Sequence, residues 1–226
     1  MRKQKGPSIV SRPLIAWVFL VSCSAMLRAA EPVEHELVNI AALPNPPLLD
    51  VRYATVFNFT KEQLYPEPVV FLHRDAARAL EKVSAALREK GFALRVFDGY
   101  RPLHVQQKMW DIVRDERYVS NPAVNRGRHT RGTAVDVSLA DLMGNPVPMP
   151  SGFDDFTERA HRDFEGSTPE EKANSKLLEE IMTAHGFVGY PTEWWHFDLA
   201  NWKSYPVLDI SIKELLEGRR TAIPVD

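Results

Sequence analysis

Two histidines and two acids, held in two short segments, give this sequence the side chains of a metal-dependent hydrolase. The first segment reads His129-Thr-Arg-Gly-Thr-Ala-Val-Asp136, and the second reads Glu193-Trp-Trp-His196. A catalytic zinc site takes three protein ligands and keeps a fourth position for water. We predict that His129, Asp136 and His196 are the ligands. Glu193 could then take a proton from the water as a general base.

Each of these residues taken alone has an ordinary structural explanation. His129 could be a solvent-facing loop histidine among basic neighbours, and Asp136 a common acid at the end of a strand. Their combination with a downstream Glu-x-x-His motif favours a metal site. The helical His-Glu-x-x-His motif does not occur in the sequence. For the other histidines we expect surface or capping positions: His35, His73, His104, His161 and His185.

Arg101 is a further candidate, in the turn Asp98-Gly-Tyr-Arg-Pro102. It could be structural, as an arginine that precedes a proline and pairs with a local acid. It could also direct its guanidinium at the oxygen that gains charge when water adds to a carbonyl. With the metal motif in the same chain, we favour the second explanation and predict Arg101 as a catalytic residue.

The ligands must be positioned by strands, which the hydrophobic pattern predicts. Residues 134–139 alternate in type, so Asp136 points away from the face of the neighbouring valines. Residues 194–199 form the last predicted strand, which carries His196. Since residues three apart on a strand point to opposite faces, we expect Glu193 to lie at the mouth of this strand, outside regular pairing.

The remaining elements predict an α+β fold. Residues 75–90 read as an amphipathic helix that stops at Gly91, and Thr168 with Glu171 forms a capping box for a helix that ends near His185. Residues 93–97 read as a strand, residues 103–114 as a helix, and residues 31–50 as an irregular lead-in. Interleaved short strands and helices predict a single domain with a central, largely antiparallel sheet, flanked by helices, with the zinc site at a cleft.

Composition limits the partners. The chain has 226 residues, of which 44% are hydrophobic, enough to bury a core. The formal net charge of -2 gives no reason to expect a nucleic-acid partner. A single cysteine excludes an intramolecular disulfide and a cysteine-rich zinc site, so any metal must be held by His, Asp or Glu.

The N-terminus predicts export. Basic residues precede the apolar run of residues 14–21, which is too short to span a membrane, so residues 1–22 read as a signal peptide. Leu20-Val-Ser-Cys23 resembles a bacterial lipobox, which would attach lipid to Cys23; otherwise we expect cleavage near residues 25–30. We predict a periplasmic location, membrane contact only through such an anchor, and a catalytic domain over residues 31–226.

Several segments together resemble the D-alanyl-D-alanine dipeptidase family, whose best-known members confer vancomycin resistance. The similarity spans about residues 48 to 205, and its order of motifs is more specific than any one of them. The segments are Tyr53-Ala-Thr, Asn58-Phe-Thr60, Phe97-Asp-Gly-Tyr-Arg-Pro102, His129-Thr-Arg-Gly-Thr-Ala-Val-Asp136, Pro148-Met149, Phe153-Asp154 and Glu193-Trp-Trp-His-Phe197.

The resemblance implies hydrolysis of the dipeptide D-alanyl-D-alanine to two D-alanines, with one zinc ion per chain on the ligands named above and Glu193 as the base. It also implies that Arg101 stabilises the tetrahedral intermediate. Asp154 would receive the free amino group of the substrate, and Tyr53 would line that pocket. The chain departs from the family pattern at Gly127-Arg128, where members carry serines before the first ligand, and Arg128 could replace the hydroxyl contact to the substrate carboxylate.

Two other functions are considered. One is a periplasmic D,D-carboxypeptidase or endopeptidase that acts on peptidoglycan stem peptides, which would need an open cleft at Asp154. The other is a zinc-containing binding module without catalysis. The presence of both Glu193 and Arg101 argues against the second, because a structural zinc needs neither.

Overall fold

The computed structural model of the chain describes Met1 and residues 36–218. The predicted signal peptide and Cys23 lie outside the described residues. Within those residues, no helix has the length and apolar character needed to cross a membrane.

A five-stranded sheet carries the candidate site. Its strand order is β2-β4-β5-β7-β6, and every neighbouring pair is antiparallel except β2 with β4. A separate two-stranded antiparallel sheet joins β1 (Leu37–Asn39) to β3 (Phe71–His73). The strands of the larger sheet are β2 (Leu48–Leu49), β4 (Phe92–Asp98), β5 (Ala134–Asp141), β6 (Phe187–Tyr190) and β7 (Glu193–Leu199).

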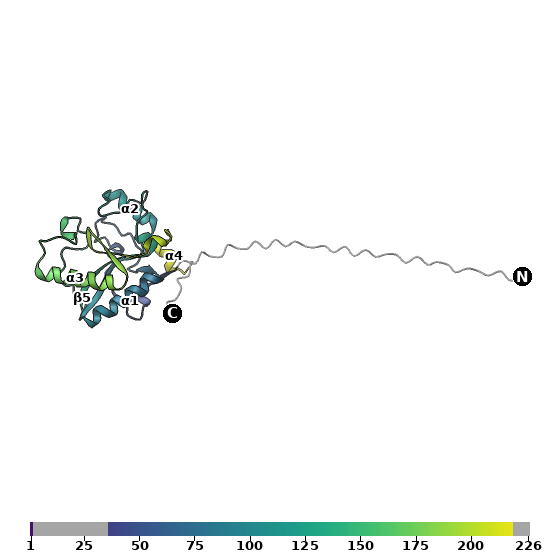
Figure 1. The fold of residues 1–226 in the computed structure, drawn as a ribbon. Helices are drawn as coiled ribbons and strands as arrows, with labels where there is room; N and C mark the ends of the chain where they lie inside the picture. The colour runs from purple at the N-terminus through teal and green to yellow at the C-terminus, as the bar shows by residue number, and fades with distance from the viewer. Residues whose placement is uncertain (2–35, 219–226) are drawn as a thin grey trace. The chain divides into compact units, whose positions relative to one another are not determined.

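Four α-helices are found in the described residues: α1 (Arg74–Glu89), α2 (Leu103–Val113), α3 (Pro169–Ala184) and α4 (Ile212–Leu216). Helices α1 and α3 lie together beside the sheet, and α2 lies apart from them (Figure 1). Five short 3-10 turns complete the described chain: η1 (Ile40–Ala42), η2 (Arg52–Ala54), η3 (His129–Arg131), η4 (Glu158–Ala160) and η5 (Trp202–Ser204).

Local sequence explains the two long helices. On α1, Leu80, Val83 and Leu87 are fully buried, as their spacing along one helical face requires. On α3, the Thr168 hydroxyl accepts from the Glu171 backbone N–H, and the Glu171 carboxylate accepts from the Thr168 N–H. This is the predicted capping box, which satisfies two backbone donors at the start of the helix.

The predicted α+β class with a largely antiparallel sheet is confirmed, but two local predictions were wrong. The segment expected to be an irregular lead-in contributes β1 and β2, because its short apolar stretches pair with strands distant in sequence. Glu193 was expected outside regular pairing, whereas it is the first residue of β7 and pairs with Tyr190 of β6.

Candidate metal centre

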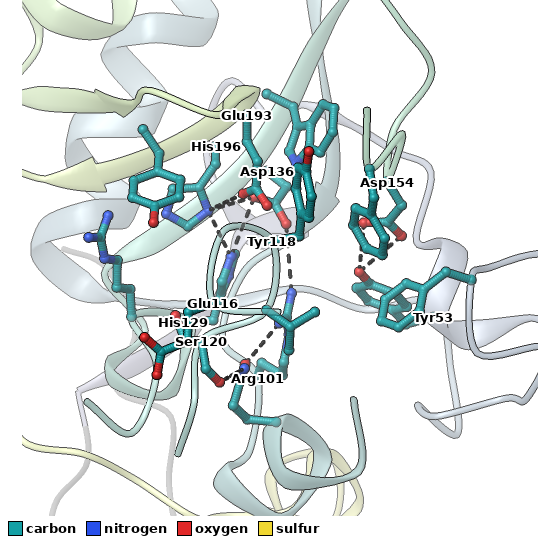
Figure 2. A pocket seen from close by; sticks show the side chains of 17 residues that line it. Tyr53, Arg101, Glu116, Tyr118, Ser120, His129, Asp136, Asp154, Glu193 and His196 are labelled. Carbon is teal, nitrogen blue, oxygen red and sulfur yellow. Dashed lines mark hydrogen bonds and ion pairs between the residues drawn. The ribbon is translucent and has the colours of Figure 1, made fainter. Parts of the chain in front are cut away.

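Strand pairing brings the three predicted ligands together. Asp136 on β5 is the register partner of His196 on β7, and His129 lies in the η3 turn that precedes β5. The Asp136 Oδ1 atom lies 3.0 Å from His196 Nδ1 and 3.4 Å from His129 Nε2, and the two ring nitrogens lie 3.2 Å apart. All three side chains are buried and point at one spot (Figure 2).

These separations fit a tetrahedral metal ion. With metal–ligand bonds of about 2.0–2.1 Å, two ligands of a tetrahedral zinc lie about 3.3 Å apart. The three observed separations bracket that value. The donor set of two imidazoles and one carboxylate is also a common one for catalytic zinc. The three residues can therefore hold a metal ion without large rearrangement.

Hydrogen bonds to the far side of each ring orient the two histidines. His129 Nδ1 lies 2.7 Å from the Gly99 carbonyl oxygen, and His196 Nε2 lies 3.1 Å from Asp198 Oδ1. Such partners fix which nitrogen faces the metal and make it a better ligand. Sequence reasoning missed Asp198, although its position two residues after His196 on the same strand face was a usable signal.

The electrostatics of the cluster keep the carboxylate ligand ionised. Burial opposes ionisation of Asp136, but His129 and His196 outweigh it and lower the pKa of this carboxyl well below its usual range. Burial likewise opposes the charged form of His196, yet Asp198 and Asp136 raise its pKa to about 10. A bound cation would take the place of this proton among the same carboxylates.

Glu193 faces the same spot although it lies three residues before His196 on a strand. The register of β6 with β7 shifts between Gly189 and Tyr190, so three residues of β7 intervene where β6 has none. This irregularity offsets the normal alternation, and Glu193 Oε2 lies 3.9 Å from His196 Nδ1. Burial raises the pKa of Glu193 to about 8, which suits a group that must accept and return a proton near neutral pH.

Arg101 is buried beside the cluster and fixed by two neighbours. Its Nε and Nη2 atoms donate to Asp98 Oδ2 at 3.0 and 2.8 Å, and its Nη1 atom donates to Gln106 Oε1 at 2.9 Å. Its Nη2 atom lies 3.8 Å from Asp136 Oδ2, so the guanidinium reaches the edge of the metal site. From the sequence, a local ion pair and an orientation toward the reaction site were alternative explanations for Arg101. The structure shows both, since the guanidinium pairs with Asp98 and also reaches the metal site.

The far side of the same pocket holds Asp154 and Tyr53 (Figure 2). The Tyr53 hydroxyl lies 3.1 Å from both carboxylate oxygens of Asp154 and donates to this group. Burial, together with the nearby Asp136 carboxylate, raises the pKa of Asp154 to about 8. Asp154 also has a φ of 60°, a conformation that costs energy outside glycine and that clusters at functional sites.

Comparison with known sequences identifies the family of this chain. The D-ala-D-ala dipeptidase family model matches residues 33–210. The chain belongs to this family. A D-alanyl-D-alanine dipeptidase of Escherichia coli K12 is 38% identical over 76% of this chain and 89% of its own length. One from Enterococcus faecium is 31% identical over 70% of this chain and 87% of its own. Among solved structures, an LD-carboxypeptidase is 19% identical with a TM-score of 0.43, covering 75% of this chain and 70% of that one.

Arg128, for which the sequence predicts a departure from the family pattern, lines the same pocket. Its Nη1 atom donates to Asp198 Oδ2 at 2.6 Å, and its guanidinium carbon lies 4.3 Å from the centre of the Tyr190 ring. The side chain is 25% exposed, and its guanidinium carbon also lies 5.2 Å from the centre of the Trp202 ring. Arg128 thus places a cation in the pocket that also contains the Asp154 carboxylate.

Proposed function

We propose that this protein hydrolyses D-alanyl-D-alanine to two molecules of D-alanine with one zinc ion per chain. The observation that carries the proposal is one pocket that contains the three ligands, Glu193 and Arg101. The same pocket contains the Asp154 carboxylate and the Arg128 guanidinium, whose charges are opposite to those at the two ends of a dipeptide. The family and the similar dipeptidases of two bacteria support the choice of substrate.

His129, Asp136 and His196 would hold the zinc. When bound, zinc lowers the pKa of a water ligand to about 7 and polarises the carbonyl of the scissile bond. Zinc suits this donor set of imidazole and carboxylate, and the residues lack the many oxygen ligands that calcium prefers.

Glu193 would carry the proton through the reaction. Its carboxylate accepts a proton from the attacking water as the water oxygen bonds to the carbonyl carbon. The same carboxyl then donates this proton to the amide nitrogen as the carbon–nitrogen bond breaks, and the second alanine leaves as an amine. Its raised pKa, near 8, is matched to both transfers.

Arg101 would stabilise the carbonyl oxygen as that oxygen gains negative charge. Asp98 and Gln106 hold the guanidinium in place before substrate arrives, so little reorganisation is needed at the moment of reaction. One well-placed donor of this kind typically contributes about 3–4 kcal/mol to transition-state stabilisation.

The two charged ends of the substrate would bind at opposite charges. Asp154, supported by Tyr53, accepts the substrate ammonium, and Arg128 binds the substrate carboxylate with the part of its guanidinium that Asp198 leaves open. A blocked or extended amino end would leave the half-buried Asp154 carboxylate without a cationic partner, which is costly. This arrangement would favour free dipeptides over peptidoglycan stems.

We also propose that the protein acts outside the cytoplasm. The basic N-terminus followed by a short apolar run supports export to the periplasm, with the lipid-anchored form at Cys23 as one version of this proposal. Labelling with a radioactive fatty acid, compared between the wild-type chain and Cys23→Ser, tests the anchor directly.

The activity is tested with purified, zinc-loaded protein and three substrates: D-Ala-D-Ala, L-Ala-L-Ala and a pentapeptide that ends in D-Ala-D-Ala. We expect release of alanine from D-Ala-D-Ala alone, lost in Glu193→Gln. Release from the pentapeptide would instead assign the chain to the carboxypeptidases. Zinc binding with no release from any substrate would make it a binding module.

A further inference from the structure

Arg162 is a largely buried arginine that lies behind the metal site, in the segment that follows η4. Its side chain is 13% exposed and lies outside the pocket that contains the metal ligands. Nothing in the proposed chemistry uses this charge. All of its polar contacts to the sheet, however, are made with the backbone of β6, of β7 and of the turn between them.

Three carbonyl oxygens of this hairpin accept hydrogen bonds from Arg162. The Nε atom donates to the Tyr190 oxygen at 2.9 Å, and the Nη2 atom donates to the His196 oxygen at 2.9 Å. The backbone N–H of Arg162 donates to the Pro191 oxygen at 3.0 Å. A single residue therefore ties the end of β6, the turn and the middle of β7 together.

These contacts lie where the strand register shifts. Gly189 pairs with Phe197, but the next residue of β6, Tyr190, pairs with Glu193. The guanidinium bridges Tyr190 and His196, one on each strand at this irregularity, and so supplies donors where the regular ladder is interrupted. The shift is also the feature that lets Glu193 and His196 face the same spot.

The space that the guanidinium occupies depends on a glycine. An ideal Cβ atom at Gly189 would lie 2.4 Å from the Cζ and Nε atoms of Arg162, closer than real atoms approach. The guanidinium also contacts Phe197 and Glu179, since the Phe197 ring centre lies 4.3 Å from Cζ and Glu179 Oε2 lies 3.4 Å from Nη1. Gly189 and Arg162 thus fit together as one unit.

We infer that Arg162 is a positioning residue for the metal centre: it holds the β6–β7 irregularity that directs His196 and Glu193 at the metal. The part of this inference that concerns turnover rests on the proposed function, whereas the part that concerns metal binding does not. Arg162 lies outside the pocket of the ligands, so it acts through the backbone that it holds and through the charge that it places near Glu193.

The first test measures zinc affinity, by competition with a chelator, in Arg162→Met and Arg162→Lys. We expect Arg162→Met to weaken zinc binding by about 10- to 100-fold, the usual effect of removing a group that orients a ligand. Arg162→Lys should lose less, because an ammonium can still donate to one carbonyl. At saturating zinc, kcat should fall in the same order while KM for the dipeptide stays near the wild-type value.

The second test uses Gly189→Ala, which displaces the guanidinium without altering Arg162. We expect this variant to reproduce the loss of Arg162→Met, and the double variant to be no worse than either single one. Arg159→Met is the matched control, because Arg159 lies in η4 and donates to the Pro150 oxygen instead of the hairpin. It should retain wild-type zinc affinity and kcat.

The inference is overturned if Arg162→Met keeps wild-type zinc affinity and only its melting temperature falls, since that is the result of a purely structural role. Independent, multiplying losses in Gly189→Ala and Arg162→Met would overturn it too. If the wild-type protein cleaves none of the peptides, the proposed function fails, but the zinc-affinity series still decides the role of Arg162.

Discussion

Two of the three metal ligands lie on strands and the third, His129, in the η3 turn beside them, whereas the substrate-binding candidates all lie in turns or loops. Asp136 and His196 face each other across two paired strands whose residues are almost all buried. Asp154 instead lies in a loop with a positive φ, Tyr53 lies in the η2 turn, and Arg128 immediately precedes η3.

This difference separates two tasks. Sheet register sets Asp136 opposite His196, and the η3 turn adds His129, so that the three ligand atoms lie within a few tenths of an ångström of a tetrahedral arrangement, as metal chemistry requires. Loops can change without disturbing the sheet, so they are suited to selecting the ends of a substrate. We therefore expect changes at the strand residues of the site to alter kcat or metal affinity, and changes at the substrate-binding loop residues to alter KM.

The largest effect is expected at Glu193. The substitution Glu193→Gln keeps the size of the side chain but removes the group that accepts the proton, so kcat should fall by about 100- to 10,000-fold. Zinc content should stay at one per chain, because Glu193 is not a ligand. Steady-state kinetics with metal analysis checks this, and a variant that retains more than a tenth of wild-type kcat would rule Glu193 out as the base.

Arg101→Lys should have the next largest effect. The ammonium keeps the charge but cannot reproduce the fixed fork held by Asp98 and Gln106, so we expect kcat/KM to fall by about 100- to 1000-fold. Arg95→Lys is the control, since Arg95 lies on β4, the strand that leads to Arg101, but contacts Asp50 and the Gly144 oxygen. Equal losses in the two variants would show that the effect is one of folding.

Asp198→Asn should act mainly on metal binding, through His196. An amide orients His196 less strongly than a carboxylate, so zinc affinity should fall by about 10- to 100-fold, measured by chelator competition. The control Asp141→Asn, at the partly exposed end of β5, should bind zinc like the wild type. If instead KM rises while zinc affinity is unchanged, Asp198 acts through Arg128 on substrate binding.

The smallest effect is expected on the thermal stability of the metal-free protein, through Asp154 in its loop. The pKa of Asp154 is raised from its usual value near 4 to about 8, so between these values the folded protein holds a proton that the unfolded chain has lost. The stability of the metal-free protein should therefore fall as pH rises from 4 to 8. Asp154→Asn removes this loss and should melt at a higher temperature than the wild type at pH 8. Thermal unfolding at pH 5 and pH 8 checks the sign; a variant less stable than the wild type at pH 8 would contradict it.

The sequence predicted which residues lie together in the site better than it predicted the elements that hold them there. His129, Asp136 and His196 were identifiable because their types and their strand and loop context restrict what they can do, and the structure brings them together. The α1 and α3 helices were predictable because spacing and capping are local signals.

The missed features depend on contacts between segments far apart in the chain. Strand β2 has only two residues, too few to show a hydrophobic alternation, and its pairing with β4 is set by the tertiary fold. The register shift that turns Glu193 toward His196 depends on Gly189 and on Arg162. Neither residue stands in a local sequence pattern that would indicate this role. Of the missed residues, only Asp198 could have been found, from its position on the face of His196.

The most direct test of the division between strands and loops compares D-Ala-D-Ala with N-acetyl-D-Ala-D-Ala in the wild type and in Asp154→Asn, with kcat and KM measured separately. We predict that the wild type strongly prefers the free amine. Asp154→Asn should raise KM for D-Ala-D-Ala at least tenfold, leave kcat within a few fold, and abolish the preference. Equal use of both substrates by the wild type, or a fall in kcat at unchanged KM in the variant, would contradict the assignment of substrate selection to the loop.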